Sequence, residues 1–245
     1  MVDPTRIGMS AKRLGNIKPA IEQHIGEDKI AGAVALVARK GQIAYQRSFG
    51  LAERETGRPM TDDAIFRIYS MTKPITMVAV LTLFERGLLR LTDPVSRFIP
   101  EFGTVKVVAD EKNPKSTLVD VEQPMTIHHL LTHTSGLTYH FGENGCVEQM
   151  YRDAAVFANM PLSEFVDQIA KMPLAFQPGT MWRYSTAHDV AARIVEIVSG
   201  KSIATYLQDE LFDPLAMNDT GFTVPAESLA RLTAEYGLGD IGDPA

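Results

Sequence analysis

The stretch SMTKPITMVAVLTLFERG, residues 70–87, contains the most informative pattern in this chain. Its apolar residues recur at helical spacing and it ends in a cationic last turn with a glycine stop, which predicts a helix over residues 70–86. Pro74 falls in the first turn of this helix, where a missing N–H costs least. Because positions i and i+3 share a helix face, Lys73 is expected to reach the hydroxyl of Ser70.

A serine and a lysine in this arrangement are a candidate nucleophile and base. The serine hydroxyl needs a base to remove its proton, and a lysine amine can do so only when it is partly neutral. Apolar flanking residues and the helix amino terminus both disfavour the ammonium form, so we expect Lys73 to be partly neutral. A chain of this length contains roughly one Ser-x-x-Lys by chance, and a helix cap beside a solvated lysine is the simplest alternative.

Composition excludes several classes of protein. The 245 residues are 45% hydrophobic and 22% charged, as in globular proteins of one or two domains. A net charge of -6 argues against nucleic acid as a partner. Cys146 is the only cysteine, which excludes an intramolecular disulfide and a thiolate zinc cluster. Residues 1–6 lack an apolar signal region and no apolar run is long enough to cross a bilayer, so we expect a soluble, cytoplasmic protein without a membrane partner.

Periodicity predicts further elements on both sides of the helix. Before it we expect a helix, a hairpin, a polar loop and an extended lead: residues 10–25 (capped by Ser10), 31–38 with 43–49, 53–63, and 65–69. After it we expect four helices: residues 126–133 (capped by Thr126), 163–170, 187–198 (ended by Gly200) and 202–212. Two long polar segments, residues 104–123 and 138–159, are typical either of lids and pocket walls or of surface excursions.

Tyr184 is a candidate for the second proton-handling group. It lies on a predicted loop between a Pro178-Gly179 turn and a helix, and its phenol can both donate and accept a proton. A core tyrosine is the alternative for any one of seven tyrosines.

Two other patterns are disfavoured by their context. His129 and His133, after His128, have the spacing of two metal ligands on a helix, but there is no Glu beside His129 and no evident third ligand, so we expect no metal. Residues 237–242 match G-x-G-x-x-G, but no helix pattern follows to receive a pyrophosphate, so no dinucleotide is expected.

Four motifs occur together in the order and approximate spacing of a known family: Ser70-Met71-Thr72-Lys73, LLTHTSGL at residues 130–137, Gln177-Pro178-Gly179 and Tyr184-Ser185. The chain resembles the serine β-lactamase and penicillin-binding-protein-like family, and within it the family VIII carboxylesterases, relatives of class C β-lactamases. Residues 213–222 also resemble a segment of these proteins, so the match runs from about residue 10 to about residue 224.

This resemblance implies Ser70 as the acylated nucleophile, its backbone N–H as an oxyanion donor, and Lys73 and Tyr184 as the proton relay, with the identity of the base left open. Gly136 and its neighbours are then structural residues that close a helix near the site. No Gly-x-Ser-x-Gly occurs, which argues against an α/β-hydrolase, and no cofactor is implied. The candidate substrate pocket consists of aromatic residues and neighbours of the motifs: Tyr69, Tyr139, Phe141, Tyr151, Phe157 and Ser185.

The implied fold is of the α/β (α+β) class, a β-lactamase/transpeptidase-like antiparallel sheet flanked by helices, with a mainly helical domain. Residues 1–65 would supply the first helix and hairpin of the sheet, residues 66–224 the helical domain, and residues 225–245 the start of a return to the sheet. The family's third motif, a Lys-Thr-Gly-like or aromatic/His-x-Gly segment, is not found, and a two-stranded hairpin is marginal alone. We therefore expect the carboxy-terminal strands to be missing, with a second chain or segment supplying them.

The predicted function is hydrolysis of short-chain carboxylic esters through an acyl-enzyme, with a small-molecule ester as the partner. Tyr184-Ser185-Thr186 stands where β-lactamases of this lineage have Tyr-x-Asn, which favours an ester over a β-lactam. The alternatives are acyl transfer to an alcohol, slow β-lactam hydrolysis, a penicillin-binding sensor without turnover, and an inactive fragment.

Overall fold

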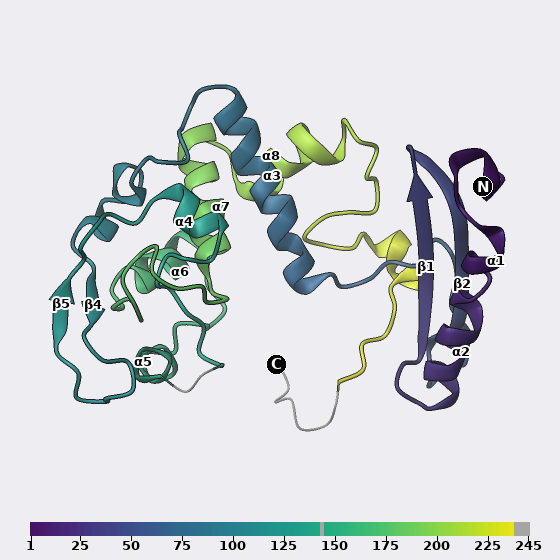
Figure 1. Ribbon diagram of the computed structural model, residues 1–245, viewed down its shortest axis with the longest axis horizontal. Coiled ribbons are helices and arrows are strands. Elements are labelled where there is room, and N and C mark those ends of the chain that lie inside the picture. The colour runs from purple at the N-terminus through teal and green to yellow at the C-terminus, as the bar shows by residue number, and fades with distance from the viewer. Residues whose placement is uncertain (143–144, 238–245) are drawn as a thin grey trace. The chain divides into compact units, whose positions relative to one another are not determined.

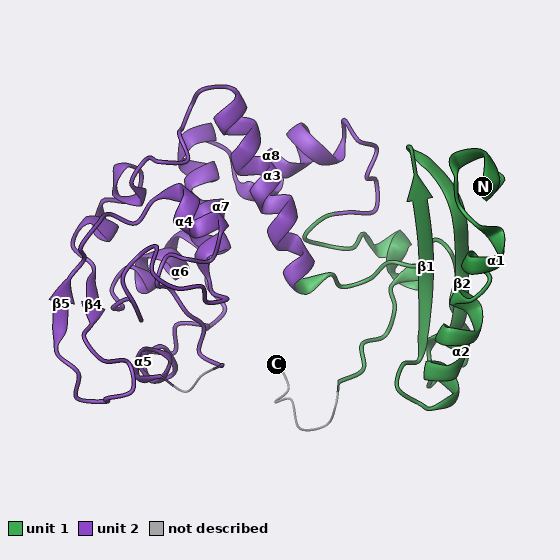
Figure 2. Cartoon of the chain, in the orientation of Figure 1, with its two compact units in different colours: residues 1–69, 221–245 green, residues 70–220 purple. Residues whose placement is uncertain are grey.

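The computed structural model describes residues 1–142 and 145–237, which divide into two compact units (Figures 1 and 2). Unit 1 is formed by Met1–Tyr69 together with the segment from Gly221 onward, and unit 2 by Ser70–Thr220. The sequence places these boundaries after residues 65 and 224. Most of the 237–242 glycine motif, and the end of the expected return to the sheet, lie outside the described residues.

Unit 1 is built on the predicted hairpin. Strands β1 (Gly32–Arg39) and β2 (Gln42–Glu53) pair in antiparallel fashion, and β3 (Arg58–Pro59) adds a short third strand to β2. The turn residues Lys40 and Gly41 have φ values of 52° and 70°, the left-handed pair that a two-residue hairpin turn requires. The hairpin prediction is therefore confirmed.

The single helix predicted over residues 10–25 is wrong, because the structure has two helices there. Helix α1 (Ala11–Leu14) is capped by the Ser10 hydroxyl as expected, and α2 (Ile17–Gly26) begins after a turn at Gly15 and Asn16. Pro19 lies in the first turn of α2 and has no N–H to continue a helical ladder back to Gly15. The helices contribute Leu14, Ile17 and Ile21 to a small core against the hairpin.

Unit 1 also contains the segment from Gly221 onward. A 3-10 turn (Ala226–Arg231) leads to a parallel bridge between Ile65 and Leu232, so the lead into Ser70 pairs with this segment. A further 3-10 turn, Pro4–Ile7, opens the chain.

Unit 2 is mainly helical. Its helices are α3 (Thr72–Glu85), α4 (Ile127–Leu131), α5 (Cys146–Asp153), α6 (Leu162–Ile169), α7 (Ala187–Ser199) and α8 (Ile203–Leu207), the last continuing into a π turn at Gln208–Phe212. Short 3-10 turns occur at Val95–Arg97 and Pro100–Gly103. The predicted helices that correspond to α4, α6, α7 and α8 are confirmed, including the Thr126 cap of α4 and the left-handed Gly200 that ends α7.

Two parts of unit 2 were not predicted. Residues 104–123 contain a small hairpin, β4 (Lys106–Val108) with β5 (Leu118–Asp120), and residues 138–159 contain α5. Helix α5 has Gly145 at its cap, and the Glu148 carboxylate accepts a hydrogen bond from the Gly145 N–H at 2.8 Å. A glycine cap carries a weaker sequence signal than Ser, Thr, Asp or Asn, which is why the helix is hard to recognise.

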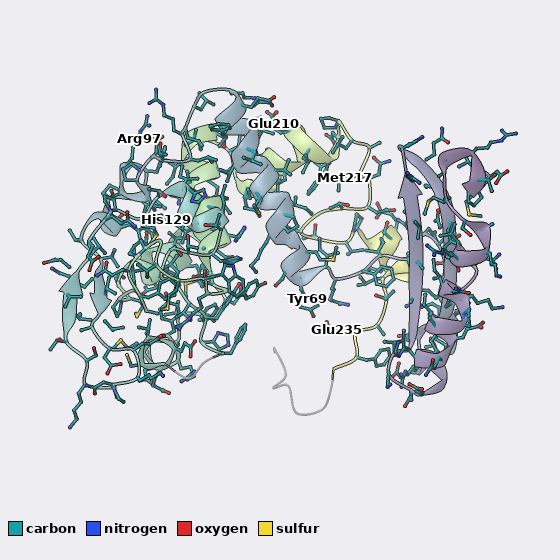
Figure 3. The ribbon with its side chains drawn as sticks, in the orientation of Figure 1. Tyr69, Arg97, His129, Glu210, Met217 and Glu235 are labelled. Carbon is teal, nitrogen blue, oxygen red and sulfur yellow. The ribbon has the colours of Figure 1, made fainter. Side chains whose placement is uncertain are left out.

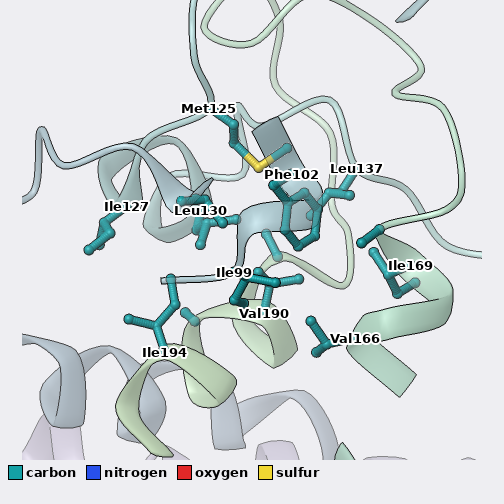
Figure 4. Close-up of a cluster of buried hydrophobic side chains, with 14 of the residues drawn as sticks. Ile99, Phe102, Met125, Ile127, Leu130, Leu137, Val166, Ile169, Val190 and Ile194 are labelled. Carbon is teal, nitrogen blue, oxygen red and sulfur yellow. The ribbon is translucent and has the colours of Figure 1, made fainter. Parts of the chain in front are cut away.

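The core of unit 2 brings α3, α4, α6 and α7 together (Figure 4). Val190 and Ile194 of α7, Val166 and Ile169 of α6, and Leu130 of α4 are fully buried. The most extensive helix–helix contact is that of α3 with α7. Among the described residues, no helix combines the length and the apolar character needed to cross a membrane.

Gly136, in the loop that follows α4, lies so close to the backbone of a neighbouring segment that only glycine fits there. Its φ is 86°, its carbonyl accepts a hydrogen bond from the Ala175 N–H at 2.8 Å, and a side chain there would overlap the carbonyl oxygen of Phe176. Glycine is thus required both by conformation and by space.

Gly136→Ala is expected to lower the free energy of unfolding by roughly 3–5 kcal/mol, because the new methyl group must displace backbone as well as adopt a strained φ. The matched control is Gly87→Ala, since Gly87 has a φ of 70° with no atom within 4 Å of the added carbon. This control isolates the conformational cost, about 1–2 kcal/mol. Urea unfolding of both variants measures the difference, and equal losses would contradict the packing argument.

Candidate active site

Ser70 and Lys73 lie side by side at the start of α3. Ser70 belongs to the 3-10 turn Tyr69–Met71 and not to the α-helix, which begins at Thr72, so the predicted helix start is corrected by two residues. The Lys73 Nζ still lies 3.2 Å from the Ser70 Oγ. The i, i+3 spacing therefore brings the two groups within hydrogen-bond distance, as predicted.

Two tyrosines from distant parts of unit 2 meet the same amine. The Lys73 Nζ donates to the Tyr139 hydroxyl at 3.0 Å, and it lies 4.5 Å from the centroid of the Tyr184 ring. The two tyrosine rings are 5.5 Å apart. Ser70, Lys73 and Tyr184, the three residues predicted to carry the chemistry, are thus neighbours, and Tyr139 joins them.

The environment of Lys73 differs from the one expected from the sequence. Burial is the largest single influence and lowers the pKa of Lys73, but interactions with the Tyr139 and Tyr184 phenols outweigh it, so the pKa lies above its ordinary value. The expectation of a partly neutral amine is therefore wrong. That expectation considered only the neighbours of Lys73 in the sequence. The hydrogen-bond acceptors that stabilise its ammonium come from residues far away in the sequence.

The remaining predicted pocket residues occupy different places. The Tyr139 ring stacks on that of Phe141 at 4.8 Å, and Phe157 lies 5.7 Å from Tyr139. Tyr151 is completely buried in the core, and Ser185 is completely buried beside Tyr184. Neither of these two is exposed to a ligand.

Tyr69 precedes Ser70 in the chain and belongs to unit 1. Its hydroxyl donates a hydrogen bond to the Glu235 carboxylate, and the two labelled side chains can be followed in Figure 3. Its φ of 42° is unusual for a residue with a side chain.

The loop after α4 holds the segment that carries Tyr184. The carbonyl groups of His133, Thr134 and Thr138 accept hydrogen bonds from the N–H groups of Arg183, Gly179 and Thr186 at 2.8, 2.7 and 3.4 Å. This pairing extends the role given to Gly136 and its neighbours, which do more than close a helix. Sequence reasoning missed it because nothing in a local pattern specifies which segments pair.

A buried ion pair flanks the same segment. The Arg183 side chain donates to both carboxylate oxygens of Glu111, one of them at 2.7 Å, and the two side chains are only 10% and 16% exposed. This contact fixes the residue before Tyr184 to the β4–β5 region. The residues are far apart in the sequence, so no spacing rule could have identified the pair.

Two histidines near the site take part in hydrogen bonds. The His129 Nδ1 accepts the Thr126 N–H at 3.3 Å and completes the cap of α4, whereas the His133 Nδ1 lies 3.2 Å from the Ser185 Oγ. Within residues 1–142 and 145–237, no three His, Cys, Asp or Glu side chains are grouped so that they could hold a metal ion.

His133 and His188 form a buried pair of rings whose centroids are 4.5 Å apart. Burial, and then the charge of Lys73, lower the pKa of His133 to about 4. Burial, and then His133 and Lys73, lower the pKa of His188 to about 4 as well. Both ring nitrogens of His188 are buried without a hydrogen-bond partner, an arrangement that costs free energy in a folded protein.

The chain has relatives among known proteins. A family model described as Beta-lactamase matches residues 17–244. Esterase EstB of Burkholderia gladioli is 40% identical over 226 residues, which cover 90% of this chain and 55% of the relative. Lovastatin esterase of Penicillium rubens is 35% identical over 226 residues, with coverage of 89% and 55%. The chain therefore spans about half the length of these curated relatives.

The fold has close matches among solved structures. EstCE1, described as a hydrolase with promiscuous acyltransferase activity, superposes with a TM-score of 0.78 at 30% identity, covering 91% of this chain and 56% of that one. The predicted β-lactamase/transpeptidase-like fold, with mixed helices and small antiparallel sheets, is confirmed.

The buried histidines predict a loss of stability in acid. Histidine in an unfolded chain has a pKa near 6.5, and the folded pKa of about 4 for His133 and His188 is lower. The unfolded chain therefore binds more protons between these values, so stability that is complete above about pH 6.5 is lost as the pH falls toward 4.

We expect the free energy of unfolding to fall between pH 7 and pH 5, with about 1–2 kcal/mol of the fall due to each histidine. Urea titrations at the two pH values measure this fall. His188→Leu removes one of the two titrating groups and should reduce the difference, and an unchanged difference would show that His188 does not titrate as described.

Proposed function

Because this chain belongs to the Beta-lactamase family, we propose that it is a serine hydrolase that cleaves carboxylic esters through an acyl-enzyme on Ser70. The observation that carries the proposal is the position of the Lys73 Nζ, 3.2 Å from the Ser70 Oγ and 3.0 Å from the Tyr139 hydroxyl. Esterase names among the relatives support the same class of reaction.

In the proposed acylation step, the Ser70 Oγ attacks the ester carbonyl carbon and its proton passes to the relay. The relay returns that proton to the departing alcohol as the bond between the carbonyl carbon and the alcohol oxygen breaks. Water then attacks the acyl group in the reverse sequence and frees Ser70. The Ser70 backbone N–H is the proposed donor to the developing oxyanion.

The charges around the site favour particular roles within the relay. The raised pKa of Lys73 favours a lasting ammonium, whose task is to stabilise negative charge on a neighbouring oxygen. Burial raises the pKa of Tyr139, the hydrogen bond with Lys73 opposes this effect only in part, and the Asp189 carboxylate adds to the rise, so the phenol stays protonated. Because the raised pKa values of Lys73 and Tyr139 keep both groups protonated, we favour Tyr184 as the group that exchanges the proton with Ser70.

The proposed substrate is a small, short-chain ester. The Tyr139 and Phe141 rings stack beside Lys73, and Phe141 is 55% exposed, so an apolar acyl or alcohol group would find an aromatic surface next to the nucleophile. Thr186, which occupies the place of the β-lactamase amide, is fully buried, and its hydroxyl donates to the Thr138 carbonyl at 3.4 Å. This favours an ester over a β-lactam.

Acyl transfer to an alcohol is the second candidate. EstCE1 is described as having promiscuous acyltransferase activity, and an acyltransferase of Penicillium decumbens is 32% identical over 71% of this chain. Hydrolysis and transfer share the acyl-enzyme and differ only in the acceptor. We also propose that a second chain or segment completes the sheet, because β3 is only two residues long and the sheet of unit 1 is otherwise a two-stranded hairpin, which is marginal alone.

Hydrolysis of p-nitrophenyl butyrate tests the leading proposal. We expect sustained release of p-nitrophenol, reduced at least about 1,000-fold in Ser70→Ala, since removing a nucleophile usually costs that much or more. Ser163→Ala, in the first turn of α6, is the matched control and should leave the rate unchanged. A single burst would indicate acylation without turnover, and release that is independent of Ser70 would refute the proposal.

Adding butanol distinguishes transfer from hydrolysis by the appearance of butyl butyrate.

Tyr139→Phe tests the role of the second tyrosine. The variant keeps the ring stacked on Phe141 but removes the hydrogen bond to Lys73, so we expect the pKa of Lys73 to fall and kcat/KM to drop about tenfold, the effect of about 1.4 kcal/mol. The measurement is the pH profile of kcat/KM. Tyr45→Phe is the control, because the Tyr45 hydroxyl is buried without a partner. Equal profiles for both variants would exclude a role for the Tyr139 hydroxyl.

A further inference from the structure

We propose that His133 is a positioning residue that holds Tyr184 against Lys73. This inference rests on the proposed function, in which Tyr184 exchanges the proton with Ser70. It concerns a residue that does not itself touch the reacting atoms. Among the hydrogen bonds of the described residues, the His133 ring contacts Ser185 and neither Ser70 nor Lys73.

His133 contacts the Tyr184 segment at three successive residues. Its carbonyl accepts the Arg183 N–H at 2.8 Å, and its Nδ1 lies 3.2 Å from the Ser185 Oγ. Between these two attachments, its ring centroid lies 4.9 Å from that of Tyr184 with the planes inclined by 41°. The backbone of His133 therefore binds the residue before Tyr184, and its imidazole binds the residue after Tyr184. The same imidazole also packs beside the Tyr184 ring.

The backbone of His133 adopts the left-handed conformation, which is uncommon for residues other than glycine. Its φ is 56°, just past the end of α4, where a helix usually places glycine or asparagine. Glycine would satisfy the backbone there without strain. The strain is kept at a position whose side chain reaches the Tyr184 segment, a pattern that is typical of functional sites.

The surroundings of the ring limit its movement. His133 is 9% exposed, and the His188 ring lies behind it at 4.5 Å. The Trp182 ring meets it edge to face at 6.0 Å. Tyr184 therefore rests on a ring that is itself packed from two other directions.

The charge state of His133 suits this role. Its pKa of about 4 leaves the imidazole neutral at pH 7, so it adds no second positive charge beside Lys73. The titratable and charged groups that face His133 are Lys73 of α3, Tyr184, and His188 of α7, whose pKa is also about 4. A neutral ring supports Tyr184 without competing with Lys73 for its phenol oxygen.

The first test uses His133→Asn, with His128→Asn as the matched control. Asparagine tolerates the left-handed backbone and can still bond Ser185, but it lacks the ring. His128 lies on the exposed face of α4, so the same substitution there should change nothing. With p-nitrophenyl butyrate under single-turnover conditions, we expect the acylation rate constant of His133→Asn to fall about 10- to 100-fold, with KM within threefold of the unsubstituted chain.

Active-site counting separates positioning from a merely structural role. Mass spectrometry of the Ser70 adduct gives the fraction of molecules that react. If His133→Asn only unfolds part of the population, fewer molecules react but each reacts at the normal rate, and the proposal is overturned. A normal rate in a fully reactive population overturns it as well. No adduct on Ser70 of the unsubstituted chain would instead refute the proposed function.

A second measurement decides the proposal without relying on activity. Tyrosine labelled with 13C at Cζ gives one signal per tyrosine, and Tyr184→Phe identifies that of Tyr184. We expect this signal to shift and broaden in His133→Asn and to remain unchanged in His128→Asn. An unchanged Tyr184 signal in His133→Asn would overturn the positioning role, whether or not the chain hydrolyses esters.

Discussion

The packing of α3 against α7 is the constraint on which the site depends. Lys73 lies in the first turn of α3, and Tyr184 lies three residues before α7 begins, so the contact between the helices fixes the distance between the two side chains. The contact is apolar, with Ala79, Val80 and Leu83 of α3 sharing one buried cluster with α7. Close-packed interiors deform little, so a short contact at the helix starts can be maintained by packing further along.

Polar groups around the start of α3 stabilise the Lys73 ammonium, which this packing partly buries. A half-buried ammonium is costly unless its protons find acceptors. Ser70 and Tyr139 supply oxygens at hydrogen-bond distance, and the Tyr184 ring presents its face to the cation. The histidines nearby are neutral at pH 7, so Lys73 is the single positive charge of this group. A cation held in this way can stabilise an oxygen that becomes negative during a reaction.

Sequence reasoning succeeded where the interaction is local. The spacing of Ser70 and Lys73, the Thr126 cap of α4 and the turn of the β1–β2 hairpin each depend on residues within a few positions of one another. Tyr184 was a candidate because of its predicted loop position and the proton chemistry of its phenol, and the family resemblance then implied its role in the relay. The prediction of one helix over residues 10–25 was wrong although it concerned neighbouring residues. It relied on the apolar periodicity and did not take into account the missing N–H of Pro19.

The parts that could not be predicted depend on contacts across the fold. Tyr139 and Tyr184 raise the pKa of Lys73 against the effect of burial, His133 supports Tyr184, and Glu111 holds Arg183. In each case the partner lies tens of residues away, and only the fold brings the two together. A pattern can identify which residues carry chemistry, but the protonation state of a lysine is decided by whichever acceptors the fold supplies.

Three unfavourable features of the chain lie around the site. Tyr69 precedes Ser70, and His133 contacts the Tyr184 segment. Both adopt left-handed backbone conformations although they carry side chains. His188 is buried with both ring nitrogens unpartnered directly behind His133. Each feature lowers stability, and an apolar residue or a glycine would remove the cost. Stabilising substitutions are easily available to most proteins, so costs of this kind beside Lys73 are compatible with an arrangement that is kept for its chemistry.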